Sequence, residues 1–158
     1  MQGRVEVVPT PGKDYTILID YAHTPDSKVN VLQTVKEFAK GRTVAVFGCG
    51  GDRDKTKRPR MGKAAADWSD FAVITTDNPR TEEPAAIIRD ILPGFDGSNT
   101  PYEVVEDRVE AIRWAMDHAQ KDDVIVLCGK GHETYQEVGH VKHHMDEREI
   151  VAEYLAKQ

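Results

Sequence analysis

Short apolar runs alternate along this chain with longer segments in which apolar residues recur at helical spacing. The runs at 43–47, 71–74 and 123–128 are almost continuously apolar, which is typical of parallel strands covered on both faces. A fourth run, at 16–20, ends in an acid, and a fifth lies near Tyr102. We therefore expect strands at 16–20, 43–47, 71–74, 102–105 and 123–128.

Helical patterns fill the intervals between these runs. Val29, Leu32, Val35 and Phe38 follow helical spacing until Gly41, for example, and Asp107 is a suitable N-cap for a later helix. The expected helices span about 27–40, 60–68, 81–92, 107–119 and 146–155. Before the last helix, 134–138 and 140–143 alternate around Gly139, which indicates a hairpin.

The alternation of strand and helix predicts a fold of the α/β class. Parallel strands need helical crossovers, and these fall on both faces of the sheet, so we expect a three-layer α/β/α Rossmann-like sandwich. Its sheet should be mostly parallel, with a small hairpin near the C-terminus. The loops that begin at Asp20, Gly48, Asp77 and Gly129 should then gather along one edge of the sheet, where ligands bind in such folds.

Composition limits the classes of protein that remain. With 158 residues the chain suits one domain, and no apolar run approaches the roughly 20 residues that span a bilayer. Cys49 and Cys128 lack metal-site spacing, and a net charge of −6 argues against a nucleic-acid binder. We expect a cytoplasmic monomer with no membrane or nucleic-acid partner.

The segment after the 71–74 run carries the most informative polar residues. Asp77, Asn78, Pro79 and Arg80 follow the strand directly, and the proline should hold them in a stiff turn. An arginine can grip a carboxylate through two parallel hydrogen bonds, so this turn is a plausible receptor for an amino acid. The alternative is an internal Asp77–Arg80 ion pair that only closes the turn.

The glycine-rich segment after Gly48 does not match a phosphate-binding loop. A dinucleotide fingerprint would need a glycine where Arg53 stands, and a Walker loop would need one at Lys55. The glycines instead allow a tight turn that lets Arg53 reach the ligand edge of the sheet. A flexible loop with a solvated Arg53 is the alternative.

The segment from Gly129 to Glu133 supplies a second set of polar groups. Glu133 could accept hydrogen bonds from a ligand ammonium, and Lys130 could meet an anionic group. His132 is either a base or a structural residue. Zinc-type ligand spacing is absent, so we predict no metal site.

Taken together, the motifs resemble those of the Mur ligase family. They are Gly-Arg-Val-Glu (3–6), Asp-Tyr-Ala-His-Thr-Pro-Asp (20–26), Gly-Cys-Gly-Gly-Asp-Arg-Asp-Lys (48–55), Asp-Asn-Pro-Arg (77–80) and Gly-Lys-Gly-His-Glu (129–133). The resemblance covers residues 1–158 and implies the C-terminal domain, without the N-terminal domain and the central ATPase domain. It implies an ATP-dependent ligase that adds meso-diaminopimelate to UDP-MurNAc-L-Ala-D-Glu through an acyl phosphate.

The resemblance also implies roles for individual residues. Matching by motif, the amino-acid pocket should be formed by Arg53, Asp77, Asn78, Pro79, Arg80, Gly129 and Glu133. The residues expected to reach toward the nucleotide are Arg4, Asp20 and His23. ATP and Mg²⁺ should be bound mainly by the central domain, and no residue of this chain is expected to be catalytic. Asp-Asn-Pro-Arg is the version of the turn found in diaminopimelate-adding members, whereas lysine-adding members differ at the position of Arg80.

Two other classes of protein are also compatible with the sequence. The chain could be a relative of folylpolyglutamate or cyanophycin synthetases, which share the fold and the acyl-phosphate chemistry. It could also be a non-catalytic amino-acid-binding or interaction module. Within the ligase reading, lanthionine could replace diaminopimelate, because Arg80 would sense only the distal carboxylate.

Overall fold

A six-stranded sheet forms the centre of the computed structural model, which describes residues 5–21, 24–130 and 133–157. In sheet order the strands are β1 (Val5–Val8), β2 (Thr16–Asp20), β6 (Val124–Cys128), β3 (Thr43–Phe47), β4 (Phe71–Ile74) and β5 (Tyr102–Val104). The edge strand β1 runs antiparallel to β2, and all other neighbours are parallel. The carboxyl ends of the parallel strands therefore share one edge of the sheet.

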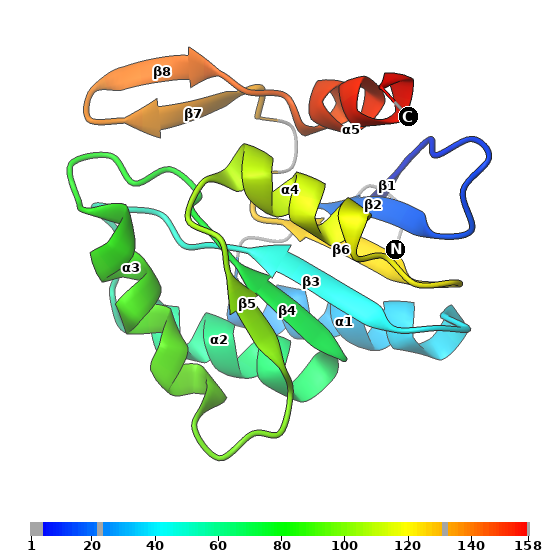
Figure 1. The fold of residues 1–158 in the computed structure, drawn as a ribbon. Helices are drawn as coiled ribbons and strands as arrows, with labels where there is room; N and C mark the ends of the chain where they lie inside the picture. Colours follow the sequence, from blue (N-terminus) through cyan, green and yellow to red (C-terminus); the bar gives the residue numbers. More distant parts are fainter. Residues whose placement is uncertain (1–4, 22–23, 131–132, 158) are drawn as a thin grey trace.

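Helices cover both faces of this sheet, as Figure 1 shows. The helices on one face are α1 (Pro25–Phe38), α2 (Lys57–Trp68) and α3 (Pro84–Ile91), which continues into the short 3₁₀ helix η1 (Leu92–Phe95). The helices on the other face are α4 (Arg108–Asp117) and α5 (Glu147–Ala156). The predicted three-layer architecture is confirmed.

The central strands are buried on both faces because their side chains alternate between two cores. In β3, Ala45 and Phe47 belong to the core beneath α1, α2 and α3, whereas Val44 and Val46 belong to the core beneath α4 and α5. All five residues of β3 are buried. This explains why the sequence shows continuous apolar runs in place of a polar–apolar alternation.

One strand and the start of one helix differ most clearly from the sequence-based expectation. Strand β1 was not expected, because Val5–Val8 is short and lies at the sheet edge, where Val7 remains exposed. Helix α2 begins at Lys57, before the expected start at residue 60. Pro59 falls within its first turn, where a missing N–H breaks no helical hydrogen bond.

A hairpin of β7 (Tyr135–Val138) and β8 (Val141–His144) confirms the small antiparallel unit near the C-terminus. It is joined to the turn after β4 by backbone hydrogen bonds. The Arg80 N–H donates to the Glu137 carbonyl at 3.1 Å, and the Gly139 N–H donates to the Arg80 carbonyl at 2.6 Å. The hairpin thus fixes the backbone of Arg80.

A buried ion pair ties α5 to α4 and to the ends of two strands. The Arg108 Nε donates to the Glu147 carboxylate at 2.9 Å, and both side chains are almost completely buried. Arg108 Nη2 also donates to the Cys128 carbonyl at the end of β6 at 2.9 Å, and its Nη1 donates to the Thr76 carbonyl at 3.4 Å. Arg108 therefore holds together segments that flank the ligand edge of the sheet.

None of the helices in the described residues has the length and apolarity needed to cross a bilayer.

Candidate functional site

A cavity of about 470 Å³ lies at the carboxyl ends of β3, β4 and β6. Its lining residues come from the loops after these strands and from the first turns of α2: Gly48, Cys49, Gly50, Arg53, Asp54, Lys57, Arg58, Met61, Asp77, Asn78, Arg80, Gly129 and Glu133. Six of the seven residues expected in the amino-acid pocket line it together. The seventh, Pro79, lies outside this lining.

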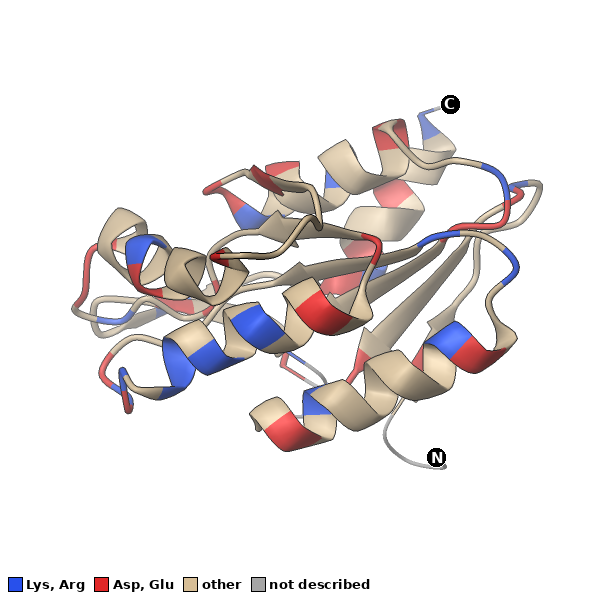
Figure 2. Ribbon diagram, turned by 90° about the horizontal axis from the view of Figure 1, so that it is seen from below, with Lys and Arg blue, Asp and Glu red and all other residues tan. Residues whose placement is uncertain are grey.

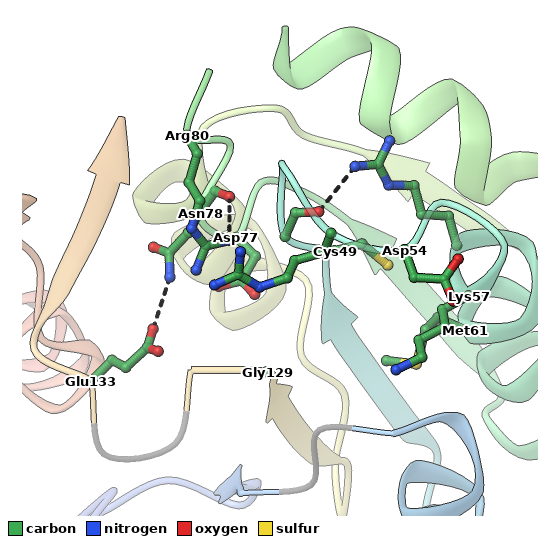
Figure 3. Close-up of a pocket in the computed structure, with 13 residues that line it drawn as sticks. Cys49, Asp54, Lys57, Met61, Asp77, Asn78, Arg80, Gly129 and Glu133 are labelled. Carbon is green, nitrogen blue, oxygen red and sulfur yellow. Dashed lines mark hydrogen bonds between the residues drawn. The ribbon is translucent and has the colours of Figure 1, made fainter. Parts of the chain in front are cut away.

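One corner of the cavity joins the turn after β4 to the loop after β6. The Asn78 Nδ2 donates to the Glu133 Oε1 at 3.0 Å, and the two side chains point toward one another in Figure 3. The Asn78 Oδ1 accepts from the Glu137 N–H at 2.9 Å, so its amide orientation is set from both sides. Gly129, with φ of +103°, lies beside the Asp77 carboxylate. This corner presents acidic oxygens to the cavity.

Lys130 lies behind this acidic corner and not in the cavity lining. Its ammonium donates to the Asn78 Oδ1 at 2.7 Å and lies 3.3 Å from the Asp77 Oδ1 and 3.1 Å from the Glu133 Oε1. Its side chain is fully buried. The idea that Lys130 could meet an anionic ligand group is therefore corrected, because its ammonium is already held by three pocket side chains.

Arg80 lies beside Asn78 in the cavity lining, with its Nη1 3.5 Å from the Asn78 carbonyl oxygen, in a backbone conformation that is unusual for a residue with a side chain. Its φ is +52°, and the two hydrogen bonds from the hairpin hold it there. Its Nη1 donates to the Gly51 carbonyl at 2.9 Å, and its Nε lies 3.3 Å from the Glu137 Oε1. Arg80 thus pairs with Glu137 and Asp77 with Lys130, so the closing Asp77–Arg80 ion pair is not the arrangement found here.

The glycine-rich loop after β3 packs closely on the turn after β4. The Gly51 N–H donates to the Asn78 carbonyl at 2.7 Å. A Cβ added at Gly51 would lie 1.8 Å from the Pro79 carbonyl oxygen, and one at Gly48 would lie 2.3 Å from that of Thr75. The glycines are needed here for close approach of two backbones, and Pro79 supports the pocket from behind.

Arg58 was missed by the sequence analysis. Although it belongs to a run of basic residues at the start of α2, visible in Figure 2, its side chain is only 1% exposed. Its Nη2 donates to the Glu82 Oε2 at 2.8 Å, and its Nη1 donates to the Asp90 Oδ2 at 2.8 Å. The hydrogen bonds from Arg58 and from the Asp52 N–H lower the pKa of Glu82 to about 2. Arg58 therefore ties the loop after Arg80 to α2.

Cys49 lines the cavity, and burial raises the pKa of its thiol to about 12. The thiol is therefore protonated at neutral pH, which makes it a poor nucleophile.

Within residues 5–21, 24–130 and 133–157, no group of three or more His, Cys, Asp or Glu side chains is arranged to hold a metal ion.

The residues expected to reach the nucleotide lie away from this cavity or outside the described residues. Asp20 ends β2 and is fully buried, with its Oδ2 3.7 Å from the Lys28 Nζ. Contact with a ribose would require that this side chain become accessible. Arg4, His23 and also His132 fall outside the described residues.

Comparison with known proteins places the chain in a family. Residues 3–131 match the family model described as "Mur ligase, glutamate ligase domain". The chain belongs to the Mur ligase family. The Mur ligase sequences similar to it include a UDP-N-acetylmuramoyl-L-alanyl-D-glutamate--2,6-diaminopimelate ligase of Clostridioides difficile, 54% identical over 99% of this chain and 32% of the relative. Another ligase of that name, from Caldanaerobacter subterraneus subsp. tengcongensis, is 55% identical over the same shares.

Solved Mur ligase structures agree with the fold. A structure of a UDP-N-acetylmuramoyl-L-alanyl-D-glutamate--2,6-diaminopimelate ligase superposes with a TM-score of 0.90 and 41% identity, and covers 100% of this chain and 32% of that protein. A bifunctional folylpolyglutamate synthase/dihydrofolate synthase superposes with a TM-score of 0.60 at 21% identity, which shows a shared fold only. This Mur ligase chain spans about a third of the length of the curated relatives it matches.

Proposed function

We propose that residues 1–158 form the C-terminal, amino-acid-binding domain of an ATP-dependent ligase that adds meso-diaminopimelate to UDP-MurNAc-L-Ala-D-Glu. The carboxylate of that dipeptide would be activated as an acyl phosphate, and the amino group of diaminopimelate would attack it. Support comes from the printed names of relatives that are 54% and 55% identical. The observation that carries the proposal is that Arg80 and Glu133 line one cavity.

The basic and the acidic residues of the cavity lining suit the two charges at the distal end of diaminopimelate. This end carries a carboxylate and an ammonium, whereas the distal end of lysine carries only an ammonium. Arg80 and Arg53 would bind the carboxylate, and Glu133 with the Gly129 carbonyl would accept from the ammonium. Lysine has no distal carboxylate, so its ammonium would lie near the Arg80 guanidinium with no negative charge on the ligand to offset the repulsion. This disfavours binding of lysine.

Three of the remaining pocket residues have supporting roles in this proposal. Asp77 adds negative charge beside the ammonium position, and Asn78 fixes the direction of the Glu133 carboxylate. Pro79 keeps the turn stiff and meets the glycine loop. The chain contributes binding and orientation of the incoming amino acid, and no catalytic residue.

ATP and Mg²⁺ belong to other parts of the ligase in this proposal. The described residues provide no metal-binding cluster, and the sequence has no phosphate-binding loop. When bound, ATP would supply the phosphoryl group that activates the dipeptide. By resemblance, Arg4, Asp20 and His23 would face the nucleotide once the domains close. We propose a cytoplasmic, monomeric enzyme.

The test is Arg80→Ala in the full-length ligase. We expect kcat/KM for meso-diaminopimelate to fall about 10- to 100-fold, as a charge-assisted interaction with a carboxylate is lost, while kcat/KM for L-lysine changes little or rises. Arg89→Ala is the matched control, because Arg89 is an exposed arginine of α3 outside the cavity lining. Unchanged preference for diaminopimelate in Arg80→Ala would contradict the proposal.

A second measurement separates this proposal from a non-catalytic binding module. The 158-residue chain alone should show no ATP-dependent ligation and only weak binding of diaminopimelate by calorimetry, because domain closure completes such sites. Tight binding by the isolated chain would favour the module. Including lanthionine as a substrate of the full-length enzyme tests whether recognition depends only on the distal end.

A further inference from the structure

Lys130 is a buried lysine whose partners are all residues of the proposed pocket or its backing. We propose that Lys130 is a positioning residue that sets amino-acid selectivity, by acting as a fixed internal counter-charge to Asp77 and Glu133. The inference rests on the proposed function and adds a residue that does not line the cavity. It does not touch the ligand; it acts through the acidic corner.

The contacts of Lys130 connect the separate parts of that corner. Its Nζ is within 3.3 Å of an oxygen on Asn78, Asp77 and Glu133, which lie on the two loops that meet there. The nitrogen also lies 5.7 Å from the centre of the Tyr135 ring, at the start of the hairpin. One ammonium therefore holds three side chains that would face the amino acid.

Because Lys130 is buried, its charge acts more strongly on its partners than the charge of a surface lysine would. The Lys130 side chain is 0% exposed, while the side chains of Asp77 and Glu133 are 14% and 30% exposed. A buried ammonium is costly unless it is well paired, and its field is weakly screened by salt. The Lys130 ammonium therefore offsets part of the negative charge that Asp77 and Glu133 present to the cavity.

This balance bears on which distal group the pocket accepts. The corner formed by Asp77, Glu133 and Lys130 carries a net charge of −1, which would be −2 without the lysine. The distal end of diaminopimelate has no net charge, whereas that of lysine has a charge of +1. Removing the Lys130 charge should therefore favour L-lysine relative to diaminopimelate, because a more negative corner attracts the cation more strongly.

A purely structural lysine would behave differently. Its removal would lower activity toward every amino acid in parallel, through misfolding or a loosened loop. A counter-charge has a selective effect, since it changes the ratio of kcat/KM for two substrates that differ in distal charge. The ratio is therefore the measurement that distinguishes the two roles.

The experiment compares Lys130→Met, Lys130→Gln, Lys130→Arg and Lys142→Met in the full-length ligase. Lys142 is the matched control: its Nζ lies 4.6 Å from the centre of the same Tyr135 ring, but it is exposed on β8 and outside the cavity lining. For each variant, kcat and KM are measured with meso-diaminopimelate and with L-lysine, and thermal unfolding is followed in parallel.

We expect the ratio of kcat/KM for diaminopimelate to that for lysine to fall about 10- to 100-fold in Lys130→Met and Lys130→Gln, the range for a lost charged hydrogen bond. The fall should come mainly from a lower KM for L-lysine, because the more negative corner attracts its distal ammonium more strongly. Lys130→Arg should retain most of the discrimination, and Lys142→Met all of it.

Other results overturn the inference. An unchanged ratio in a folded neutral variant would do so, and so would loss of folding in both neutral variants, which would make the role of Lys130 structural. The proposed function is checked separately by the unsubstituted enzyme. If that enzyme does not use diaminopimelate, the proposed function fails, whatever the variants show.

Discussion

Replacing Arg108 with methionine would remove one half of the buried ion pair between α4 and α5. The guanidinium makes hydrogen bonds to the Glu147 carboxylate and to the Cys128 and Thr76 carbonyls. Methionine has a similar length but no donors, so it would leave the Glu147 carboxylate, 1% exposed, without its main counter-charge. Two strand-end carbonyls would also lose a donor.

The size of the effect follows from this loss of pairing. Removing one partner of a buried ion pair costs about 3–5 kcal/mol of unfolding free energy. For a chain of this size, each kcal/mol shifts Tm by about 2–4 °C, so we expect Tm to fall by about 6–20 °C. The double substitution Arg108→Met/Glu147→Leu should recover much of this loss, since it removes the buried charge altogether.

Urea unfolding of the chain and of its variants measures these free energies directly. Arg113→Met provides the control on the same helix, because Arg113 forms an exposed pair with Glu110, in which the side chains are 37% and 58% exposed. That pair should contribute less than about 1 kcal/mol. If Arg108→Met costs no more than Arg113→Met, or if the double variant is less stable than Arg108→Met, the reasoning about burial is refuted.

Three further predictions concern the loops around the cavity. Gly51→Ala should raise KM for the amino acid and lower Tm, because its Cβ would collide with the Pro79 carbonyl. Gly97→Asn, in open space at φ of +78°, should leave KM unchanged and lower Tm less, since only its positive φ opposes the side chain. The pKa of Glu82 lies near 2, below its usual 4.5. The stability that ionised Glu82 contributes should therefore be complete above about pH 4.5 and be lost as the pH falls toward 2. In Glu82→Gln, the unfolding free energy should depend less on pH between these two values. Because the pKa of Cys49 is about 12, iodoacetamide should label this thiol slowly at pH 7.5, and fast labelling there would contradict the raised pKa.

The architecture could be predicted from the sequence because each central strand corresponds to a continuous run of apolar residues. Phe71–Ile74 shows this most clearly, since the polar residues begin directly where the strand ends. Strand β1 could not be predicted in the same way. Val5–Val8 is four residues long and is defined by its pairing with β2, which no local pattern reveals.

The lining of the cavity could be anticipated from motif positions, whereas the residues behind it could not. Lys130 reads as an exposed lysine between two glycines, and its burial depends on side chains more than 50 positions away. Arg58 likewise reads as part of a basic helix start, and its partners Glu82 and Asp90 lie 24 and 32 positions further on. Neither spacing corresponds to a local motif, so only the folded chain identifies these contacts.

The attachment of the hairpin to Arg80 has a consequence for attempts to exchange selectivity between ligases. Both backbone hydrogen bonds that keep this residue at positive φ come from residues 137 and 139, which contribute no side chain to the cavity lining. A graft of residues 77–80 alone would therefore bring the guanidinium without the scaffold that aims it. Recipient enzymes would need the β7–β8 segment as part of the same transplant.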